Sequence, residues 1–317
     1  MTILWQKQPC HSERSEESET FRMVRKAIVP MAGLGTRLYP VGVILPKGLM
    51  PFALADGRLT TGLQLIAETL LAAGVEQIGV VVSPENRSVY EAFLEGGGAR
   101  YAHARAKRPE MQQTYESLQR LRCHLTFVEQ PELLGLGHAV WCARDFAAGE
   151  PVLVFLGDHI PMPLGDPTPI RQAMRLFDER QAPIYSVHRV PLDKVSLYGV
   201  LQGEPTDAPR VYRLLQLYEK PTPDYAQQHL HTAGLAPDEF FAHSGVYAFP
   251  PALWDALEQI AAAHDPSQGE WTLTHAQQRL LQQTPAYLYE TEHHWLDFGT
   301  AREYQRAFCY LAGCSDV

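Results

Sequence analysis

The sequence lacks several features that would assign it to a common class of protein. No apolar run approaches the ~18 residues of a membrane-spanning helix, so we expect no membrane span and no membrane partner. The five cysteines are an odd number without a CxxC pair, which is typical of free thiols in a reducing cytoplasm rather than of disulfides or a zinc site. No internal repeat of about 20 to 50 residues and no hexapeptide pattern is found, so we expect neither a solenoid nor a β-helix.

Basic residues are also few. The chain has 27 Lys and Arg residues against 36 Asp and Glu residues, for a net charge of −9 at pH 7. A general nucleic-acid binder would carry a basic face, so we expect no nucleic-acid partner. The 317 residues, of which 45% are hydrophobic and 20% charged, are instead typical of a globular protein with one large α/β domain or two small ones.

The strongest positive signal is a glycine-containing loop that follows a short apolar strand. Residues 27–30 predict a β-strand, and Gly33, Gly35 and Arg37 come directly after it. Two glycines let backbone N–H groups approach a ligand, and a nearby cation adds fixed positive charge. The P-loop string GxxxxGK[ST] is absent, and Leu38 replaces the third glycine of a dinucleotide fingerprint. The loop therefore predicts a polyphosphate site of another kind, with an ordinary strand-to-helix turn as the alternative.

The flanking residues make this loop more specific. GLGTRLYP at 33–40, followed by LPKGLMP at 45–51, resembles the signature of the sugar-1-phosphate nucleotidyltransferases, most closely the bacterial UTP–glucose-1-phosphate uridylyltransferases. The resemblance continues from about residue 26 to residue 308. It implies an α/β fold of the Rossmann-like, three-layer α/β/α type with a mostly parallel central sheet.

Hydrophobic periodicity predicts several elements of such a fold. An apolar stripe ending in a glycine predicts a helix over 62–74, with Gly74 as its C-cap. Together with the strands on either side of it, this helix forms a βαβ unit. The polar, Arg-rich stretch 101–119 indicates a surface insertion. The remaining predictions are strands over 77–82, 152–156, 184–190, 198–202, 212–218 and 245–249, and a helix over 252–262.

These elements suggest a division of the chain. Residues 1–24 are charged and serine-rich without periodicity, so we expect a disordered or spurious N-terminal extension, with Met23 as the suspected start. We expect residues 25–317 to form a single nucleotidyltransferase domain. Its parts are a nucleotide-binding half (about 25–160), a sugar-binding half (about 161–300) and a C-terminal helix (about 301–313).

Two aspartates carry the expected metal site. Asp158 follows the predicted strand 152–156, at the edge where an open parallel sheet places its ligands. Taken alone it could equally be a loop or N-cap carboxylate, and Asp297 in the string WLDFGT could be an ordinary turn residue. Their match to the family motifs implies that Asp158 and Asp297 together hold Mg²⁺, which prefers oxygen ligands and bridges to nucleotide phosphates. Relatives often have a second Asp after the first one, where this chain has His159.

The nucleotide-binding residues also follow from the resemblance. GLGHAV at 135–140 is similar to the uridylyltransferase string, which implies that the Gln130 side chain and the Gly135 backbone read the pyrimidine edge. Spacing alone leaves a glycine-rich helix start open, and we expect a structural role for His138. The loop residues assigned to the nucleotide are Ala32, Gly33, Gly35 and Thr36.

The sugar-phosphate site is implied by two further motifs. Glu219-Lys220-Pro221 alone is a common turn, but in the family the Glu accepts from sugar hydroxyls and the Lys binds the sugar phosphate. The glycine that matches Gly199 lets the sugar lie against the backbone. We therefore assign Gly199, Glu219 and Lys220 to the sugar phosphate. Arg37 and Lys47 are assigned catalytic roles, Arg37 as a fork on the triphosphate and Lys47 as a point charge between the two substrates.

These assignments predict transfer of a uridylyl group from UTP to a sugar-1-phosphate, with glucose-1-phosphate as the family default. The attacking phosphate is already anionic near neutral pH, so the chemistry needs positioning and electrostatics and no general base. Two alternatives stay open. One is thymidylyl transfer, which the string at 295–300 favours and the string at 135–140 opposes. The other is a non-catalytic homologue that binds a sugar nucleotide. Family members commonly form dimers or tetramers, which implies a homo-oligomer.

The chain departs from the family pattern at three further places. Gly42-Val43 stands where relatives have Thr-Lys, Gly48 stands where they have Glu, and His275 replaces a common Asp. The first two changes remove charge near the predicted site, and we expect them to bear on substrate choice.

Overall fold

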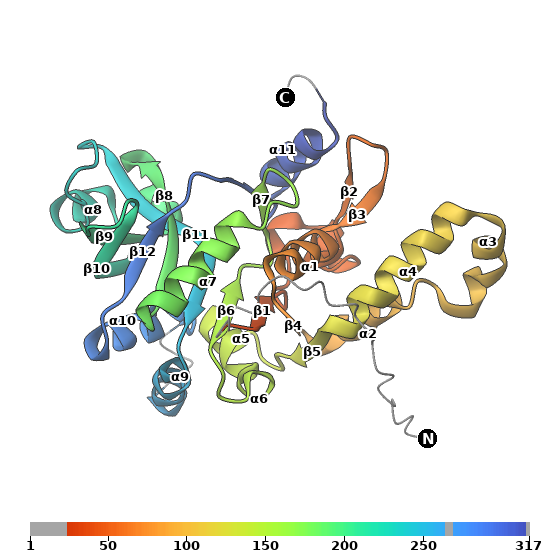
Figure 1. Cartoon of the computed structure of the whole chain (residues 1–317), viewed down its shortest axis with the longest axis horizontal. Coiled ribbons are helices and arrows are strands. Elements are labelled where there is room, and N and C mark those ends of the chain that lie inside the picture. The colour runs from red at the N-terminus through yellow and green to blue at the C-terminus, as the bar shows by residue number, and fades with distance from the viewer. Residues whose placement is uncertain (1–23, 264–268, 315–317) are drawn as a thin grey trace.

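A nine-stranded sheet forms the centre of the molecule in a computed structural model that describes residues 24–263 and 269–314 (Figure 1). The strand order is β5-β4-β1-β6-β11-β8-β12-β10-β9. Its strands are β1 (Lys26–Pro30), β4 (Gln77–Val82), β5 (Leu125–Glu129), β6 (Val152–Phe155), β8 (Ile184–Pro191), β9 (Gly199–Pro205), β10 (Val211–Glu219), β11 (Glu239–Phe249) and β12 (Tyr287–Glu290). Two small antiparallel pairs join β2 (Pro51–Ala53) to β3 (Leu59–Thr61) and β7 (His159–Met162) to β13 (His294–Asp297).

The sheet is parallel in its first part and mixed in its second. Strands β5, β4, β1 and β6 are parallel neighbours, whereas β11 runs antiparallel to both β6 and β8. Beyond β8, strand β12 is parallel to β8, and β10 is antiparallel to β12 and β9. The α/β class is confirmed, but a mostly parallel sheet is wrong for the second half. There, a short connection joins β9 to β10, and such a connection favours an antiparallel pair over a helical crossover.

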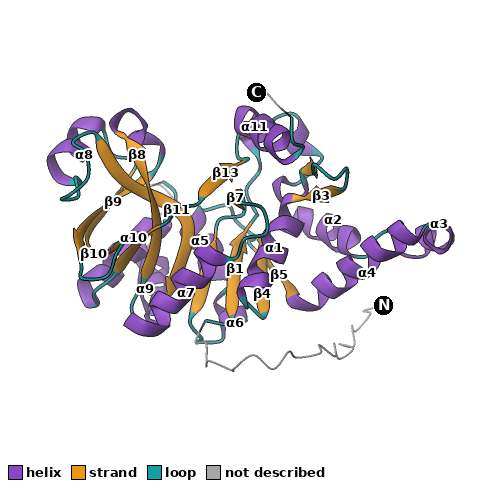
Figure 2. Cartoon of the chain, turned by 45° about the horizontal axis from the view of Figure 1, so that its top comes forward, coloured by secondary structure: helices purple, strands orange, loops and turns teal. Residues whose placement is uncertain are grey.

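Helices cover both faces of the sheet (Figures 1 and 2). Along β1 the side chains alternate, with Ala27 and Val29 in one apolar core and Ile28 in the other. The first core is covered by α1 (Gly62–Ala73), α2 (Pro84–Leu94), α4 (Pro109–His124) and α7 (Thr168–Arg180). The second is covered by α5 (Leu136–Cys142), α6 (Arg144–Ala147), α9 (Ala252–Ala263) and α10 (Leu273–Gln283).

The remaining helices lie toward the periphery. Helix α3 (Ala102–Lys107) and part of α4 project from the body of the molecule (Figure 1), and α8 (Pro223–His229) lies at the opposite end near β9 and β10. Helix α11 (Ala301–Leu311) follows β13. The short 3-10 helices are η1 (Thr36–Leu38), η2 (Val41–Val43), η3 (Lys47–Leu49), η4 (Gly98–Tyr101) and η5 (Leu192–Leu197). None of the helices in the described ranges is both long and apolar enough to cross a lipid bilayer.

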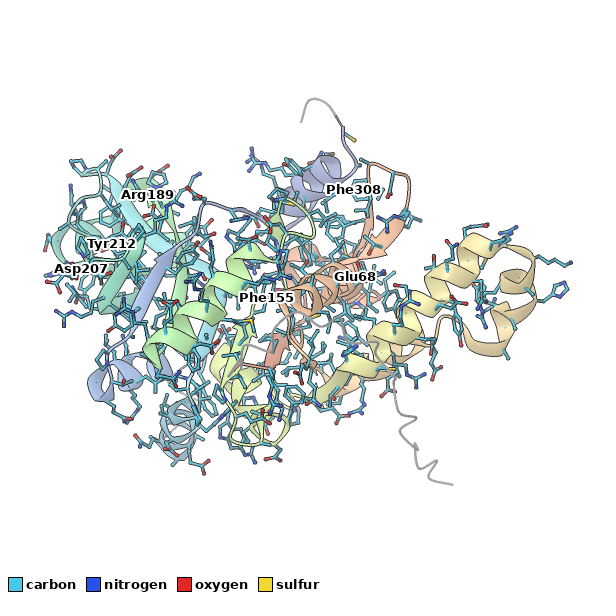
Figure 3. All side chains as sticks on the ribbon, in the orientation of Figure 1. Glu68, Phe155, Arg189, Asp207, Tyr212 and Phe308 are labelled. Atoms are coloured by element: carbon cyan, nitrogen blue, oxygen red, sulfur yellow. The ribbon has the colours of Figure 1, made fainter. Side chains whose placement is uncertain are left out.

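Side-chain hydrogen bonds join neighbouring strands in the second half of the sheet. Figure 3 places Phe155 near the centre of the molecule and Arg189 and Tyr212 toward the end that carries β9 and β10. Arg189 and the Tyr212 hydroxyl both donate to the carboxylate of Glu290, at 2.6 and 3.0 Å. This network joins β8, β10 and β12, which are neighbours in the sheet.

Most elements predicted from the sequence are present. Helix α1 ends as expected at Gly74, whose φ of 100° is in the left-handed region that favours glycine. All the predicted strands occur within one or a few residues, although β11 begins six residues earlier than the predicted 245. The insertion over 101–119 is helical, because α3 and α4 together span most of it. The predicted extension 1–24 falls almost wholly outside the described residues, as does Met23.

Candidate active site

The glycine loop lies against the strand end that carries Asp158. Strands β1 and β6 are parallel neighbours, so their carboxyl ends meet at the same edge of the sheet. Gly157 packs so closely on the turn after β1 that a Cβ there would lie 2.6 Å from Cγ of Met31. Within the loop, Gly35 has a φ of 63°, and a Cβ added to Gly33 would meet no atom within 4 Å. The loop therefore leaves open space beside its backbone, next to Asp158.

Asp158, Asp297 and Lys47 converge at one point. Strand β13 pairs with β7 so that Asp297 lies opposite His159. A Cβ built on Gly299 would lie 2.9 Å from Oδ1 of Asp297, 3.0 Å from Oδ2 of Asp158 and 3.2 Å from Nζ of Lys47. The Lys47 ammonium forms an ion pair with Asp158 Oδ2. The fold thus brings together the two carboxylates and one cation that the sequence had placed on three separate segments.

The surroundings lower the pKa of the Asp158 carboxyl group and raise the pKa of the Asp297 carboxyl group. Burial alone would raise the pKa of Asp158, but the Lys47 ammonium and His159, which donates to Asp158 Oδ1 over 2.9 Å, lower the pKa overall. Burial and the neighbouring Asp158 charge raise the pKa of Asp297. Burial opposes protonation of His159, but the Asp158 carboxylate raises the pKa of this imidazole overall. Two carboxylates held close together and largely away from water repel each other, and a bound cation would relieve this repulsion.

The donor set suits a hard cation. Oxygen atoms of Asp158 and Asp297 both lie about 3 Å from the same point beside Gly299. Within residues 24–263 and 269–314 there is no group of three or more His, Cys, Asp or Glu side chains arranged to hold a metal. Mg²⁺ commonly takes one or two carboxylates and completes its shell with waters and substrate phosphates, so the two aspartates fit this ion better than they fit zinc.

Arg37, the residue predicted to bind the triphosphate, lies just after the glycine loop and is exposed. Arg37 is exposed in η1, and its guanidinium is in no ion pair with the described residues. Thr36 beside it is also exposed. Both residues are therefore accessible to a ligand.

Gln130 and Gly135 are bonded to each other. Gln130 is buried at the end of β5, and its Nε2 donates to the Gly135 carbonyl over 3.1 Å. Gly135 has a φ of 115°, and a Cβ there would lie 2.6 Å from the carbonyl oxygen of Trp271. Ala32 belongs to the same apolar core as Ala139 of α5. Of the residues predicted to bind the nucleotide, Gln130 and Gly135 are therefore in direct contact, and Ala32 packs in the core covered by α5, whose N-cap is Gly135.

The expected structural role of His138 agrees with its surroundings. The ring is buried, stacks on Trp141 with centroids 6.0 Å apart and lies 5.5 Å from the Trp271 ring. Its Nδ1 lies 2.8 Å from the Glu132 carbonyl, which requires the proton to be on Nδ1 for a hydrogen bond. His138 thus ties the start of α5 to the segment that precedes it.

Gly199, Glu219 and Lys220 form a second cluster in the other half. Gly199 and Glu219 are opposite each other in the β9–β10 ladder. The Lys220 backbone has a φ of 47°, and its Nζ lies 4.0 Å from Oε1 of Glu219. Two residues that the sequence prediction missed complete the cluster. Thr274 donates to Glu219 Oε2 over 2.9 Å, and the His243 ring packs against Gly199. No local pattern marks either residue, because both reach the site only through the fold.

A β-bulge links the two clusters. The register of β11 on β8 shifts between His243 and Tyr247, and Gly245 within this bulge has a φ of 83°. A Cβ on Gly245 would lie 3.3 Å from Cγ of His159, the neighbour of Asp158. Strand β11 therefore runs from the carboxylate cluster to the wall around Gly199.

The structure accounts for two of the departures from the family pattern. A Cβ on Gly42 would lie 2.7 Å from the Gly35 carbonyl oxygen, so η2 packs directly on the glycine loop. Gly48 is buried, and a Cβ there would run into the Met31 sulfur and lie 2.8 Å from the Tyr90 hydroxyl. A side chain as large as Glu has no space at position 48. His275 is exposed on α10, so no contact explains its difference from the family Asp.

Comparisons with known proteins agree with these arrangements. A family model described as nucleotidyl transferase matches residues 26–313. A UTP–glucose-1-phosphate uridylyltransferase of Bacillus subtilis is 31% identical over 285 residues, covering 88% of this chain and 87% of that protein. One from Pseudomonas aeruginosa is 27% identical over 293 residues, covering 91% and 96%. The solved structure of a UDP-glucose pyrophosphorylase complexed with UDP-glucose superposes with a TM-score of 0.73 at 24% identity, covering 91% of this chain and 98% of that one. The chain therefore belongs to the nucleotidyl transferase family, as its loop and strand-end motifs predicted.

Proposed function

We propose that this protein transfers a uridylyl group from UTP to a sugar-1-phosphate, with glucose-1-phosphate as the expected sugar, and releases a UDP-sugar and pyrophosphate. The observation that carries the proposal is the convergence of Asp158, Asp297 and Lys47 beside the glycine loop. The names of the Bacillus and Pseudomonas relatives support UTP and glucose-1-phosphate as the substrates.

The reaction brings two polyanions together. An oxygen of the sugar phosphate attacks the α-phosphorus of UTP, and the bond from this phosphorus to the pyrophosphate group breaks. The attacking oxygen is already ionised, so the protein has to position both substrates and stabilise charge on the departing pyrophosphate. We assign Arg37 to the triphosphate, with which its planar guanidinium can form two parallel hydrogen bonds. We assign Lys47, which is paired with Asp158, to the space between the two phosphate groups.

Asp158 and Asp297 would hold Mg²⁺ in this site. When bound, the ion supplies positive charge that offsets the charge of the nucleotide phosphates. His159 holds Asp158 Oδ1, and the Gly299 N–H donates to Asp297 Oδ1 over 2.5 Å. These two bonds fix the orientation of both carboxylates before any ligand arrives, which reduces the ordering that binding must still supply.

The two halves of the chain would divide the substrates between them. The nucleotide half, about 25–160, contributes Gln130 and the Gly135 backbone to the base and the loop 32–36 to the phosphates. The sugar half, about 161–300, contributes Glu219 to the hydroxyls and Lys220 to the sugar phosphate. Lys220 suits this role because its side chain is 62% exposed and carries a mobile charge.

Pyrophosphate release tests the proposal. The purified full-length chain is assayed with Mg²⁺ and each combination of UTP or dTTP with the 1-phosphates of glucose, galactose and mannose, and the nucleotide sugar is identified by mass. We expect turnover to be fastest with UTP and glucose-1-phosphate. A preference for dTTP would replace uridylyl by thymidylyl transfer, and no pyrophosphate with any pair would leave the non-catalytic homologue as the better account.

A further inference from the structure

One buried imidazole in the sugar half has no role in the proposed reaction so far. His243 lies on β11 just before the bulge, and its ring packs against the backbone of Gly199. A Cβ on Gly199 would lie 2.8 Å from His243 Cδ2, 3.4 Å from His243 Nε2 and 3.1 Å from Glu219 Oε2. The imidazole and the carboxylate therefore border the same small volume beside Gly199.

The hydrogen-bonding groups of His243 are not used by the protein. Both ring nitrogens are buried and lack a hydrogen bond of good geometry within the described residues. Buried polar groups in proteins nearly always have a partner, and one without a partner at a candidate binding site calls for an explanation. The residue as a whole is partly exposed, so His243 lies at the edge of the core rather than at its centre.

The chemistry of this pair suits a sugar hydroxyl. Burial lowers the pKa of His243 to about 3, with His188 adding to the effect and a contact from Gln277 opposing it, so the ring is neutral near neutral pH. A neutral imidazole offers one donor and one acceptor, whereas an ionised carboxylate only accepts. A sugar hydroxyl both donates and accepts. It can therefore donate to the Glu219 carboxylate and accept from the N–H of His243.

The position of Glu219 is fixed in a way that serves such a contact. Thr274 donates to Glu219 Oε2, and this threonine is buried. Oε2 of Glu219 is therefore held toward Gly199, while the side chain as a whole remains 39% exposed. On the other side, Gly245 of the bulge touches His159, so His243 lies between the carboxylate cluster and Glu219.

We propose that His243 is a specificity-determining residue, whose imidazole reads a hydroxyl of the sugar phosphate together with Glu219. This inference rests on the proposed function and deepens it, because it names the residue that distinguishes one sugar from its epimers. A purely apolar residue at this place would enclose a sugar without selecting the orientation of its hydroxyls.

The test compares two variants of the full-length protein. His243→Leu keeps much of the volume and removes both nitrogens, and His243→Gln keeps a donor and an acceptor near Nε2. For His243→Leu we expect KM for the preferred sugar-1-phosphate to rise by about tenfold and its preference over the C2 and C4 epimers to fall by at least about tenfold. His243→Gln should recover part of both losses. KM for UTP should stay within about twofold in both variants, since the nucleotide lies in the other half.

A control variant and a measurement of folding complete the test. His124→Leu, which alters an exposed histidine bonded to the Glu76 carbonyl, is the matched control and should resemble the wild type. Thermal unfolding identifies variants that fold, and His243→Gln serves if the leucine variant does not. Unchanged sugar KM and epimer preference in folded His243→Leu, or in His243→Gln where only that variant folds, would overturn the inference while leaving uridylyl transfer intact. An equal rise in KM for UTP would overturn it as well. A wild type that turns over no sugar-1-phosphate would overturn the proposed function, and this inference with it.

Discussion

The carboxylates of Asp158 and Asp297 meet beside the Cα of Gly299, although one follows β6 and the other ends β13. Only the antiparallel pairing of β7 with β13 brings them together, since it sets Asp297 opposite His159. The carbonyl of Asp158 also accepts from the Phe298 N–H over 3.0 Å, which holds the second segment against the first. The site is therefore built by one short two-stranded ladder, and its chemistry depends on that ladder.

Neutralising either carboxylate should abolish most of the activity. We expect Asp158→Asn and Asp297→Asn each to lower kcat by about 10²–10³-fold, because each removes a preorganised charge at the developing transition state. The measurement is pyrophosphate release over a range of Mg²⁺ concentrations, in which the variants should also need more Mg²⁺ for half-maximal rate. Asp145→Asn, at a side chain that is 89% exposed, is the control. Variants that keep wild-type Mg²⁺ dependence would contradict the metal assignment.

Removing the guanidinium of Arg37 should slow the reaction with little effect on folding. The residue is exposed on the glycine loop, so we expect Arg37→Ala to reduce turnover by about 10²–10³-fold while the melting temperature stays unchanged. Steady-state kinetics with UTP and glucose-1-phosphate measure the effect. Arg175→Ala, at a side chain 82% exposed on α7, controls for general loss of positive charge. A loss smaller than about threefold would remove Arg37 from the mechanism.

Replacing Gln130 should affect the nucleotide and spare the sugar. The Gln130 amide is buried and bonded to the Gly135 carbonyl, so Gln130→Leu removes a hydrogen-bonding group and frees a loop that the base would contact. We expect KM for UTP to rise by about tenfold, with KM for the sugar phosphate within about twofold. Gln228→Leu on the exposed face of α8 is the matched control. An equal rise in both KM values would speak against a base-reading role.

A methyl group at position 48 should destabilise the protein. The Cβ of Gly48→Ala would meet the Met31 sulfur and the Tyr90 hydroxyl, and overpacking of this kind costs about 1–3 kcal/mol of unfolding free energy. Urea unfolding measures the change. Gly33→Ala, where the added atom meets nothing within 4 Å, should leave stability unchanged. Adding Tyr90→Phe to Gly48→Ala should recover part of the loss, and strictly additive effects would show that the predicted contact is not made.

The carboxylate of Asp166 should give an acid-dependent contribution to stability. Bonds from Thr168 and from His293 lower the pKa of Asp166 to about 2, below the ordinary value of about 3.9. A carboxylate with a lowered pKa stabilises the fold above the unfolded pKa, and this stability is lost as the pH falls. We expect Asp166→Asn to cost about 1 kcal/mol at pH 7, a magnitude typical of a capping carboxylate near the surface.

Urea unfolding of the wild type and of Asp166→Asn from pH 7 down to pH 2 tests this. The difference between the two proteins should be constant above about pH 5 and should shrink between about pH 4 and pH 2. A difference that does not vary with pH would show that the charge of Asp166 contributes nothing.

Structural elements that depend only on residues close together in the sequence could be predicted. The loop at 33–37 follows an apolar strand, and α1 has an apolar stripe with a glycine at its end, so both could be recognised from neighbouring residues. Helix α4 was missed because only Leu118 and Leu121 are buried along it, which leaves too weak an apolar period to detect. The first half of β11 was missed because its period is interrupted at the bulge.

Contacts between distant segments could not be predicted in the same way. The pairing of Asp158 with Asp297 was expected only from the family motifs, since it requires the β7–β13 ladder. Nothing in the sequence around His243 or Thr274 distinguishes them from ordinary residues of a strand and a helix. Their position beside Glu219 depends on the neighbouring strands β9 and β10 and on the packing of α10. His293 is partly buried and bonded to Asp166, a contact that no pattern in the sequence indicates.

Strand β11 has a consequence for attempts to divide the molecule. Its C-terminal residues pair with β6, and its N-terminal residues pair with β8 and touch β9, so one strand belongs to both ends of the sheet. A chain cut near residue 160 would expose the unpaired edge of β6 on one fragment and of β11 on the other, and bare strand edges invite aggregation. Separately expressed fragments should therefore be insoluble, while co-expression should rescue them as a complementing pair.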